Sequence, residues 1–280
     1  MTIAIAVKVN DGIVLASDST TTVVQNGQVL NTYNNANKIF NLVKTQRLGA
    51  STWGTGNIGR SSISTLMKDF REQLTRELRP PGTDGQPQYT VLDVAQKLRV
   101  FFYEDRYQTH HSQNPDFPHE DTGFLIAGYS VGSDLPEAYE IQILGGQCTE
   151  PMLRLPPETS GVVWNGQPEA LVRFVLGFSP SWVTPVMTQF GIPNERLFEL
   201  VEVIKTHANM PLAVDAMPVQ DAIDLAQFLV ELAINASRFW PGVQTIGGPV
   251  EIAAITKHEG FKWVKRKHYY TPNLNPDLPR

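Results

Sequence analysis

Two short apolar runs at the start of the chain constrain the fold most, because they have the pattern of two strands joined by a tight turn. IAIAVKV (3–9) and IVLAS (13–17) are rich in β-branched and small apolar residues. Asn10-Asp11-Gly12 separates them, and Asp-Gly between two such runs is a strong β-hairpin signal. Strands that arrive as hairpins pair antiparallel, which argues against a doubly wound parallel sheet.

The rest of the chain alternates between groups of strands and groups of helices. Further strands are predicted at 38–43, 48–53, 122–130, 138–144, 160–166 and 249–255. Helices are predicted from the apolar periodicity at 63–74, 91–108, 168–178, 195–206 and 218–239. This order favours an α+β chain of stacked antiparallel sheets with helices outside. We expect one domain over 1–267, an irregular insertion at about 179–217, and a polar, Pro-rich tail at 268–280.

Composition excludes several classes of function. The 280 residues carry a formal net charge of -5, without the basic stripe that nucleic-acid binding needs. Cys148 is the only cysteine, so neither a disulfide within the chain nor a thiolate zinc site is possible. No apolar run has the length of a membrane span. We therefore expect a cytoplasmic protein with no nucleic acid, membrane, metal or cofactor as partner.

Three polar residues near the N-terminus form a candidate catalytic group. A two-residue turn at Asp11-Gly12 would place Asp18 opposite Ile5, which leaves Thr2 roughly 10 Å further along the strand. A long cationic side chain would have to bridge that gap, and Lys38 is the candidate. A lysine on an apolar face loses hydration, which lowers its pKa unless a carboxylate such as Asp18 compensates.

Thr2 offers a nucleophile and a base on one residue. Removal of Met1 would expose its α-amine, a group whose usual pKa of about 7.7–8.0 suits a base near neutral pH. The hydroxyl of the same residue would then be the nucleophile. The cation of Lys38 would favour loss of the hydroxyl proton.

The first part of the chain closely resembles the start of a mature proteasome β-type subunit. TIAIAVKVNDGIVLASDS matches the terminal threonine and the hairpin that follows it, and ANKIF matches the segment of the active-site lysine. GASTWGTGNIGRSSISTLMKDF is similar to the turn that opens the family's first long helix. The chain also resembles simpler bacterial relatives of the proteasome, such as the two-component ATP-dependent protease subunit and the Anbu group.

The resemblance implies a role for each matching residue. Thr2 corresponds to the nucleophile, Lys38 to the active-site lysine, and Asp18 to the carboxylate that orients that lysine. A backbone N–H in the turn at Trp53-Gly54 corresponds to the oxyanion donor, and the Trp53 side chain would narrow the substrate pocket.

Later in the chain the resemblance is weaker. TSGVVWNG (159–166) is similar to the segment that carries a helper serine, which falls on Ser160. The family's D-x-x-S-G-G block is replaced by Val243-Gln244-Thr245-Ile246-Gly247-Gly248, which keeps the glycines and lacks the aspartate and serine. Thr245 is a candidate for a partial substitute.

As a whole, the resemblance implies a threonine-type endopeptidase of the N-terminal nucleophile hydrolase superfamily. The implied fold is a four-layer αββα sandwich. The implied partners are a peptide or unfolded-protein substrate, copies of the chain in a ring, and an ATPase unfoldase. Two alternatives remain open: a non-catalytic assembly subunit, which the lost aspartate and serine favour, and an amidohydrolase acting on small amides.

Two further motifs suggest other chemistry. Residues 54–59 match the dinucleotide-binding pattern G-x-G-x-x-G, but no acidic residue on a second strand follows at the required distance. His110, His111 and His119 share one loop with acidic residues, a composition that polar loops also reach without a metal. Neither motif displaces the hydrolase hypothesis.

Overall fold

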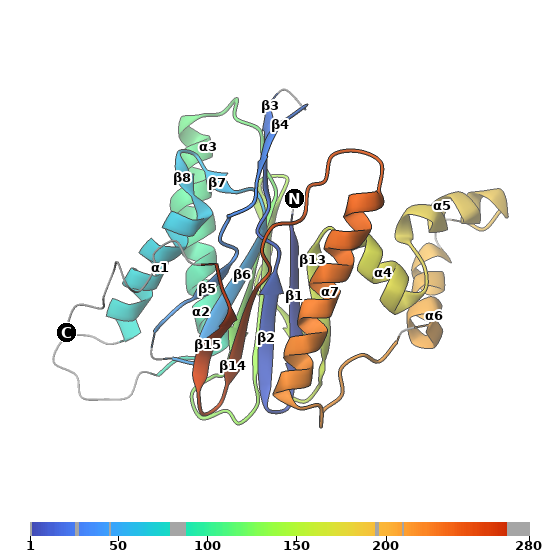
Figure 1. The fold of residues 1–280 in the computed structure, drawn as a ribbon. Helices are drawn as coiled ribbons and strands as arrows, with labels where there is room; N and C mark the ends of the chain where they lie inside the picture. The colour runs from blue at the N-terminus through green and yellow to red at the C-terminus, as the bar shows by residue number, and fades with distance from the viewer. Residues whose placement is uncertain are drawn as a thin grey trace.

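The computed structural model describes residues 2–25, 28–44, 46–78, 88–193, 196–208 and 210–267. Two antiparallel sheets pack face to face at its centre (Figure 1). The first sheet has the order β13 (Gly161–Gly166), β1 (Ile3–Val9), β2 (Gly12–Ser17), β14 (Glu251–Thr256), β15 (Gly260–Lys265). The second has the order β11 (Gln147–Cys148), β10 (Glu137–Leu144), β9 (Thr122–Gly128), β6 (Leu48–Gly54), β5 (Ile39–Asn41), and β12 (Met152–Leu155) also pairs with β10.

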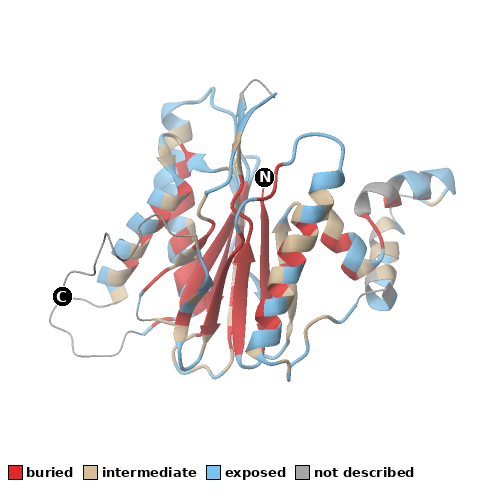
Figure 2. Cartoon of the chain, in the orientation of Figure 1, coloured by how far each residue is buried: buried red, intermediate tan, exposed pale blue. Residues whose placement is uncertain are grey.

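A continuous apolar core fills the space between the sheets. It contains Leu15 and Ile255 from the first sheet and Leu125 and Ala127 from the second, all almost fully buried. β1 and β2 are buried along their whole length, because apolar residues on both faces of these strands meet a neighbouring layer (Figure 2). Two-sided burial explains why both strands are apolar runs rather than alternating ones.

Helices cover the outer face of the second sheet. They are α1 (Ile63–Leu78) and a continuous helix composed of α2 (Val91–Arg99), the π-helical stretch η1 (Val100–Gln108) and α3 (Thr109–Gln113). The apolar residues of α1 that recur at helical spacing are all buried, as their period predicts. Thr90 caps α2 in a reciprocal pair with Asp93, which fixes where that helix begins.

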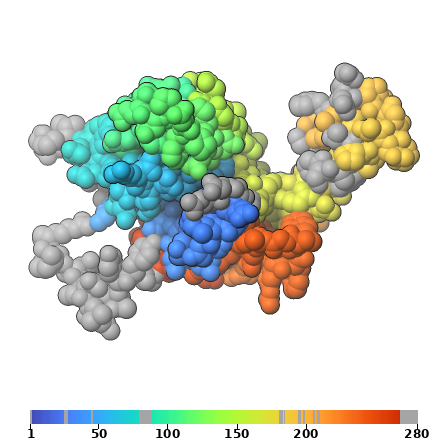
Figure 3. All heavy atoms as spheres, turned by 90° about the horizontal axis from the view of Figure 1, so that it is seen from above, coloured from blue at the N-terminus to red at the C-terminus, as the bar shows by residue number. Residues whose placement is uncertain are grey.

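The first sheet is covered by α7 (Val219–Phe239) and α4 (Glu169–Leu176). Two further helices, α5 (Pro180–Gln189) and α6 (Leu197–Ala208), project from this side as an arm (Figure 3). The arm has a small core of its own, in which Phe178, Val183 and Met187 are buried. The predicted irregular insertion at 179–217 therefore contains two helices where the sequence indicated one.

The predicted four-layer αββα sandwich is wrong as a description of this chain. Its sheets are antiparallel as expected, but several elements belong to no layer. The helical arm is one, and two separate hairpins are others: β3 (Thr21–Gln25) with β4 (Gln28–Tyr33), and β7 (Asn57–Ile58) with β8 (Ser61–Ser62). The predicted tail at 268–280 lies outside the described residues. Within the described part of the chain, no helix combines the length and apolarity that spanning a membrane requires.

The turn of the first hairpin differs from the sequence prediction. Val9 pairs with Gly12 and Ala4 with Ser17, so Asn10-Asp11 forms the turn and Gly12 already belongs to β2. A side chain at position 12 would have its Cβ 3.0 Å from the backbone oxygen of Ile255 on the neighbouring β14. The glycine is therefore needed for close strand packing, and this pairing brings Asp18 two residues nearer to Thr2 than predicted.

Candidate active site

Thr2 lies at the start of β1, on the wall of a cavity of about 260 Å³. The residue is almost completely buried, and its carbonyl oxygen accepts a hydrogen bond from the Gln167 N–H at 2.8 Å. The cavity wall consists mainly of hydroxyl and amide side chains with one cation, and includes Thr20, Thr21, Asn35, Asn37, Lys38, Thr52, Trp53, Gly54, Thr55, Ser62 and Ser64. The predicted nucleophile, lysine and oxyanion turn thus share one cavity.

Asp18 and Lys38 form a buried ion pair beside this cavity. Lys38 Nζ lies 2.6 Å from Asp18 Oδ1, and the two side chains are 6% and 0% exposed. The same oxygen accepts the Ile3 N–H at 3.1 Å. The other oxygen accepts the N–H groups of Thr20 at 3.1 Å and Gly247 at 3.0 Å. With four donors, the carboxylate is fixed in place and in turn fixes the lysine.

Burial lowers the pKa of Lys38, and the charge and hydrogen bond of Asp18 oppose that effect. Desolvation disfavours the ammonium form, whereas the neighbouring carboxylate favours it. The ammonium form of Lys38 therefore gives up its proton at a lower pH than an exposed lysine would. Such a group, in the wall of the cavity that Thr2 also lines, is suited to stabilise an alkoxide.

Gly247 and Gly248 connect the segment before β14 to the ion pair. Gly247 donates its N–H to Asp18, and Gly248 adopts a φ of +72°. A Cβ on Gly248 would lie 2.8 Å from the backbone oxygen of Asn34, so only glycine fits. This contact explains why Gly248 is present although the aspartate and serine of the resembling family are absent.

Thr245 acts on Thr2 through a residue that the sequence did not indicate. Its hydroxyl donates to Gln167 Oε1 at 2.8 Å, and the Gln167 backbone N–H binds the carbonyl of Thr2. Gln167 follows a strand and precedes α4, and its position beside Thr2 depends on the pairing of β1 with β13. No local pattern in the sequence could have identified it.

The turn at Trp53-Gly54 ends β6 at the cavity. Gly54 has a φ of +91°, and a Cβ there would fall 2.3 Å from the carbonyl oxygen of Asp121. The Trp53 indole lies over Gly123, where a Cβ would come within 2.3 Å of the ring. Gly123 thus makes room for the tryptophan, whose side chain forms part of the cavity wall.

Ser160 is not brought to the site. The pairing of β1 with β13 sets Lys8 opposite Gly161 and Ile3 opposite Gly166, so Ser160 lies at the far end of β1 from Thr2. At about 3.3 Å per residue the separation is roughly 20 Å. The Ser160 hydroxyl is buried, with no hydrogen-bond partner among the described residues. The prediction that placed it beside Thr2 is corrected by this register.

The two competing motifs have structural roles. The glycines of 54–59 shape the short β7–β8 hairpin at the edge of the cavity, and Gly59 packs against His110. The rings of His111 and His119 stack 4.5 Å apart, and His111 also stacks on Tyr107. Stacked rings do not direct their nitrogens to one point, and no metal-binding group of side chains occurs within the part of the chain that the structure describes.

A larger hollow, of about 470 Å³, lies between α1 and α2. Its wall includes the exposed ion pair of Lys97 with Glu77, and Asp93 and Asp105. We assign the site to the smaller cavity because Thr2 and Lys38 of the buried ion pair both line it, and these residues carry groups that can do chemistry.

The fold is similar to solved structures of Anbu proteins. One is an Anbu (Gly-1) mutant from Hyphomicrobium sp. strain MC1, with 15% identity over 98% of this chain and 92% of that chain and a TM-score of 0.51. Another is the helical assembly of the Anbu complex from Pseudomonas aeruginosa, with 15% identity over 96% of this chain and 88% of that chain and a TM-score of 0.49. No protein-family model matches the chain. No curated protein matches it either.

The match to the Hyphomicrobium structure corrects the sequence-based resemblance. Anbu proteins are a proteasome-like family distinct from the β-type subunits, which overturns the prediction that this chain is a proteasome β-type subunit. The match does not establish the predicted membership of the N-terminal nucleophile hydrolase superfamily. At 15% identity, the similarity establishes the fold and nothing about activity.

Proposed function

We propose that the chain is a threonine-type peptidase whose nucleophile is the Thr2 hydroxyl, exposed together with its α-amine by removal of Met1. The observation that carries the proposal is the buried Asp18–Lys38 pair, whose lysine lines the same cavity as Thr2. An ion pair buried this completely costs desolvation energy, and a lysine of perturbed pKa in a cavity wall is a candidate functional residue.

In the proposed reaction, the Thr2 oxygen attacks the carbonyl carbon of the substrate and its proton passes to the α-amine. The Lys38 ammonium, held by Asp18, stabilises the negative charge on the attacking oxygen. A backbone N–H at the Trp53-Gly54 turn would donate to the oxyanion. The α-amine then gives its proton to the leaving amine, and water hydrolyses the ester on Thr2.

The hydroxyl- and amide-rich wall suits a peptide, whose backbone offers N–H and C=O groups for hydrogen bonding. Small amides would satisfy few of these groups, so we favour peptides over small amides as substrate. A screen of both substrate types at equal concentration separates the two candidates. Hydrolysis of small amides alone would replace the peptidase with an amidohydrolase.

The first test is the intact mass of the protein purified from its host, followed by labelling with an electrophile directed at threonine nucleophiles. Loss of Met1 and one adduct on Thr2 are expected. Thr2→Ala should abolish labelling and peptide hydrolysis. Thr109→Ala removes a hydroxyl from α3, outside the cavity, and serves as the control, with activity expected within a few-fold of the unaltered chain. Retention of Met1 with no adduct would favour the non-catalytic assembly subunit.

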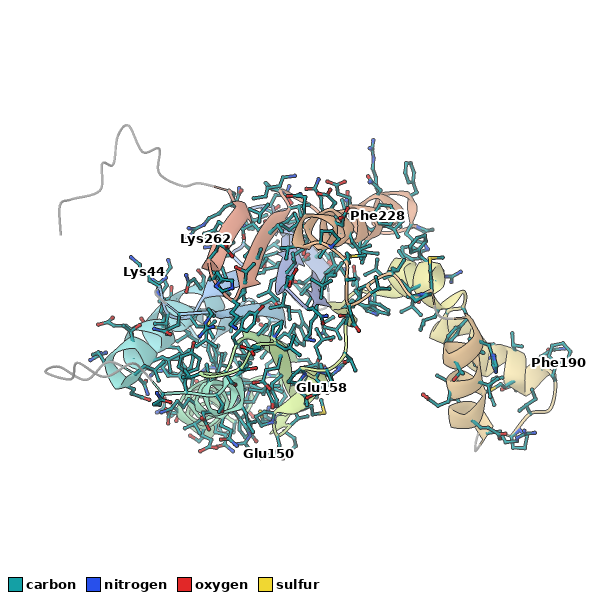
Figure 4. The ribbon with its side chains drawn as sticks, turned by 90° about the horizontal axis from the view of Figure 1, so that it is seen from below. Lys44, Glu150, Glu158, Phe190, Phe228 and Lys262 are labelled. Atoms are coloured by element: carbon teal, nitrogen blue, oxygen red, sulfur yellow. The ribbon has the colours of Figure 1, made fainter. Side chains whose placement is uncertain are left out.

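We also propose that the working form contains several copies of the chain. The support is the arm, which exposes large apolar side chains: Val186, Phe190, Val203 and Met210. Phe190 is 76% exposed. Figure 4 shows it at the far end of the arm. Light scattering should detect an oligomer, and Phe190→Ser should weaken it. Leu144→Ser changes another exposed apolar residue and serves as the control, which should leave the oligomer unchanged. A monomer at all concentrations would contradict this proposal. An ATPase partner remains a prediction from sequence.

A further inference from the structure

A second buried ion pair lies next to the first. Lys267 Nζ is 2.8 Å from Glu251 Oε2, and the two side chains are 8% and 2% exposed. Glu251 opens β14, and Lys267 follows the last strand, β15. The other carboxylate oxygen of Glu251 is buried, with no hydrogen-bond partner among the described residues. A charged pair in this position has a cost that the fold must offset.

The Lys267 ammonium joins the two segments that carry the first pair. It donates to Ser19 Oγ at 2.7 Å and to the carbonyl oxygen of Ala36 at 2.7 Å. Ser19 directly follows Asp18, and Ala36 precedes Lys38 by two residues. The Ala36 N–H also donates to the Ser19 carbonyl at 2.8 Å. Lys267 therefore fixes the spacing between the backbone of the carboxylate and that of the lysine.

Lys38 also lies in the electrostatic field of this second pair. Besides burial, the pKa of Lys38 is raised by Asp18 and Glu251 and lowered by Lys267. On the α1 side, Lys68 and Arg71 line a small adjoining cavity together with Glu251 and Arg266. The two members of the second pair thus act on the proton of Lys38 in opposite directions.

We propose that Lys267 and Glu251 are positioning residues that hold Lys38 against Asp18 and set the alkaline limit of the reaction. This inference rests on the proposed function, in which Lys38 acts as an ammonium group. The rate would rise with pH as the Thr2 α-amine loses its proton, which sets the acidic limb of the pH–rate profile. The rate would fall at higher pH as the Lys38 ammonium loses its proton, which sets the alkaline limb.

The test compares two single variants with opposite electrostatic effects. Lys267→Met removes a like charge, so the alkaline limb should move to higher pH by about one unit. Glu251→Gln removes an opposite charge and should move the limb to lower pH. A purely structural role would lower the rate in both variants without moving the limb in opposite directions. Limbs that stay in place, or that move together, overturn the proposal.

The titration of Lys38 itself separates this inference from the proposed function. Its Nζ can be followed by NMR in protein labelled with ¹⁵N-lysine, with Lys38→Arg identifying the signal. If the Lys38 titration shifts in opposite directions in the two variants, the effect of the second ion pair on Lys38 is supported, whether or not any peptide is hydrolysed. Absence of peptide hydrolysis would refute only the proposed peptidase activity. If peptide hydrolysis depends on Thr2 but the Lys38 titration is the same in the variants and in the unaltered chain, only the proposed role of Lys267 and Glu251 is refuted.

A double variant covers the case in which a single variant fails to fold. Glu251→Gln with Lys267→Met leaves no unpaired buried charge, and replacing both members of such a pair is often tolerated. Its alkaline limb should lie between those of the single variants, and its kcat should fall about tenfold at unchanged KM, because the link between Ser19 and Ala36 is lost. A folded double variant with kcat equal to that of the unaltered chain would overturn the proposal.

Discussion

A buried lysine lies near each end of strand β1, and the two lysines have different partners. At the Thr2 end, Lys38 pairs with Asp18 and lines a cavity. At the other end, Lys8 is fully buried, and its Nζ donates to the carbonyl oxygens of Pro157 at 2.8 Å and Thr159 at 2.7 Å. Figure 4, from below, labels the neighbouring Glu158 in the loop at this end.

The comparison shows that burial of a lysine does not by itself indicate a reactive site. The pKa of Lys8 is lowered by burial, as is that of Lys38. Lys8, however, binds neutral carbonyl groups of one loop, which suits a structural role. Lys38 has a carboxylate partner that is itself held by backbone N–H groups, and it lies in a cavity wall beside a hydroxyl. The partner and the access to a cavity distinguish the two.

The largest expected effect is on activity. Lys38→Met should reduce kcat/KM by about 10²- to 10³-fold, because the charge that stabilises the attacking oxygen is removed. Lys8→Met, its matched control, should leave the activity of each folded molecule unchanged. Peptide hydrolysis normalised to active sites by labelling of Thr2 measures both. Equal losses in the two variants would remove the distinction between the ends of β1.

Stability should also separate the two lysines. Lys38→Met leaves Asp18 buried without its cation and should cost about 3–5 kcal/mol of unfolding free energy. Lys8→Met leaves two carbonyl groups without a donor and should cost about 1–3 kcal/mol. Urea unfolding at pH 7 provides the measurement. Recovery of stability in the double variant Asp18→Asn with Lys38→Met would confirm that the unpaired carboxylate causes the larger loss.

The pH dependence of stability should be similar for the two lysines. Each lysine has a pKa in the folded protein that is lower than its usual value of 10.5. Between the folded pKa and the usual pKa, the unfolded chain therefore binds more protons than the folded protein does. The unfolding free energy of the unaltered chain, minus that of either Met variant, should therefore rise with pH through this window and be constant below it. Urea titrations from pH 6 to 10.5 test this sign. A difference that falls with pH would mean that the folded state favours the charged lysine.

The smallest effect is expected at Ser160. Its buried hydroxyl has no hydrogen-bond partner among the described residues and lies at the Lys8 end of β1. Ser160→Ala should change the unfolding free energy by no more than about 0.5 kcal/mol and leave peptide hydrolysis unchanged. A large loss of hydrolysis would restore the helper role that the sequence resemblance implied and require a different arrangement of β13.

The sequence predicted the elements of the fold well where the pattern is local. The first hairpin and the helices at Ile63–Leu78, Val91–Arg99 and Val219–Phe239 follow from apolar periodicity and turn residues. The β3–β4 hairpin and α5, the first helix of the arm, were not predicted. The apolar side chains of the hairpin are exposed, so no alternation marks its strands. α5 contains Pro185, a residue that normally argues against a helix.

Chain order and spacing, together with the resemblance to the start of a proteasome β-type subunit, selected Thr2, Asp18 and Lys38 as a group. Each lies in or beside a strand that the local pattern identifies. Only the tertiary structure decided how these residues meet. With Gly12 packed against β14, the turn lies one residue earlier than predicted, which shifts the strand pairing by two residues and brings Asp18 opposite Ile3. The β1–β13 register carries Ser160 away. Gln167, Glu251 and Lys267 join the site from segments more than a hundred residues distant from Thr2 in sequence. Strand register and buried pairing depend on several segments packing at once, and no single stretch of sequence contains that information.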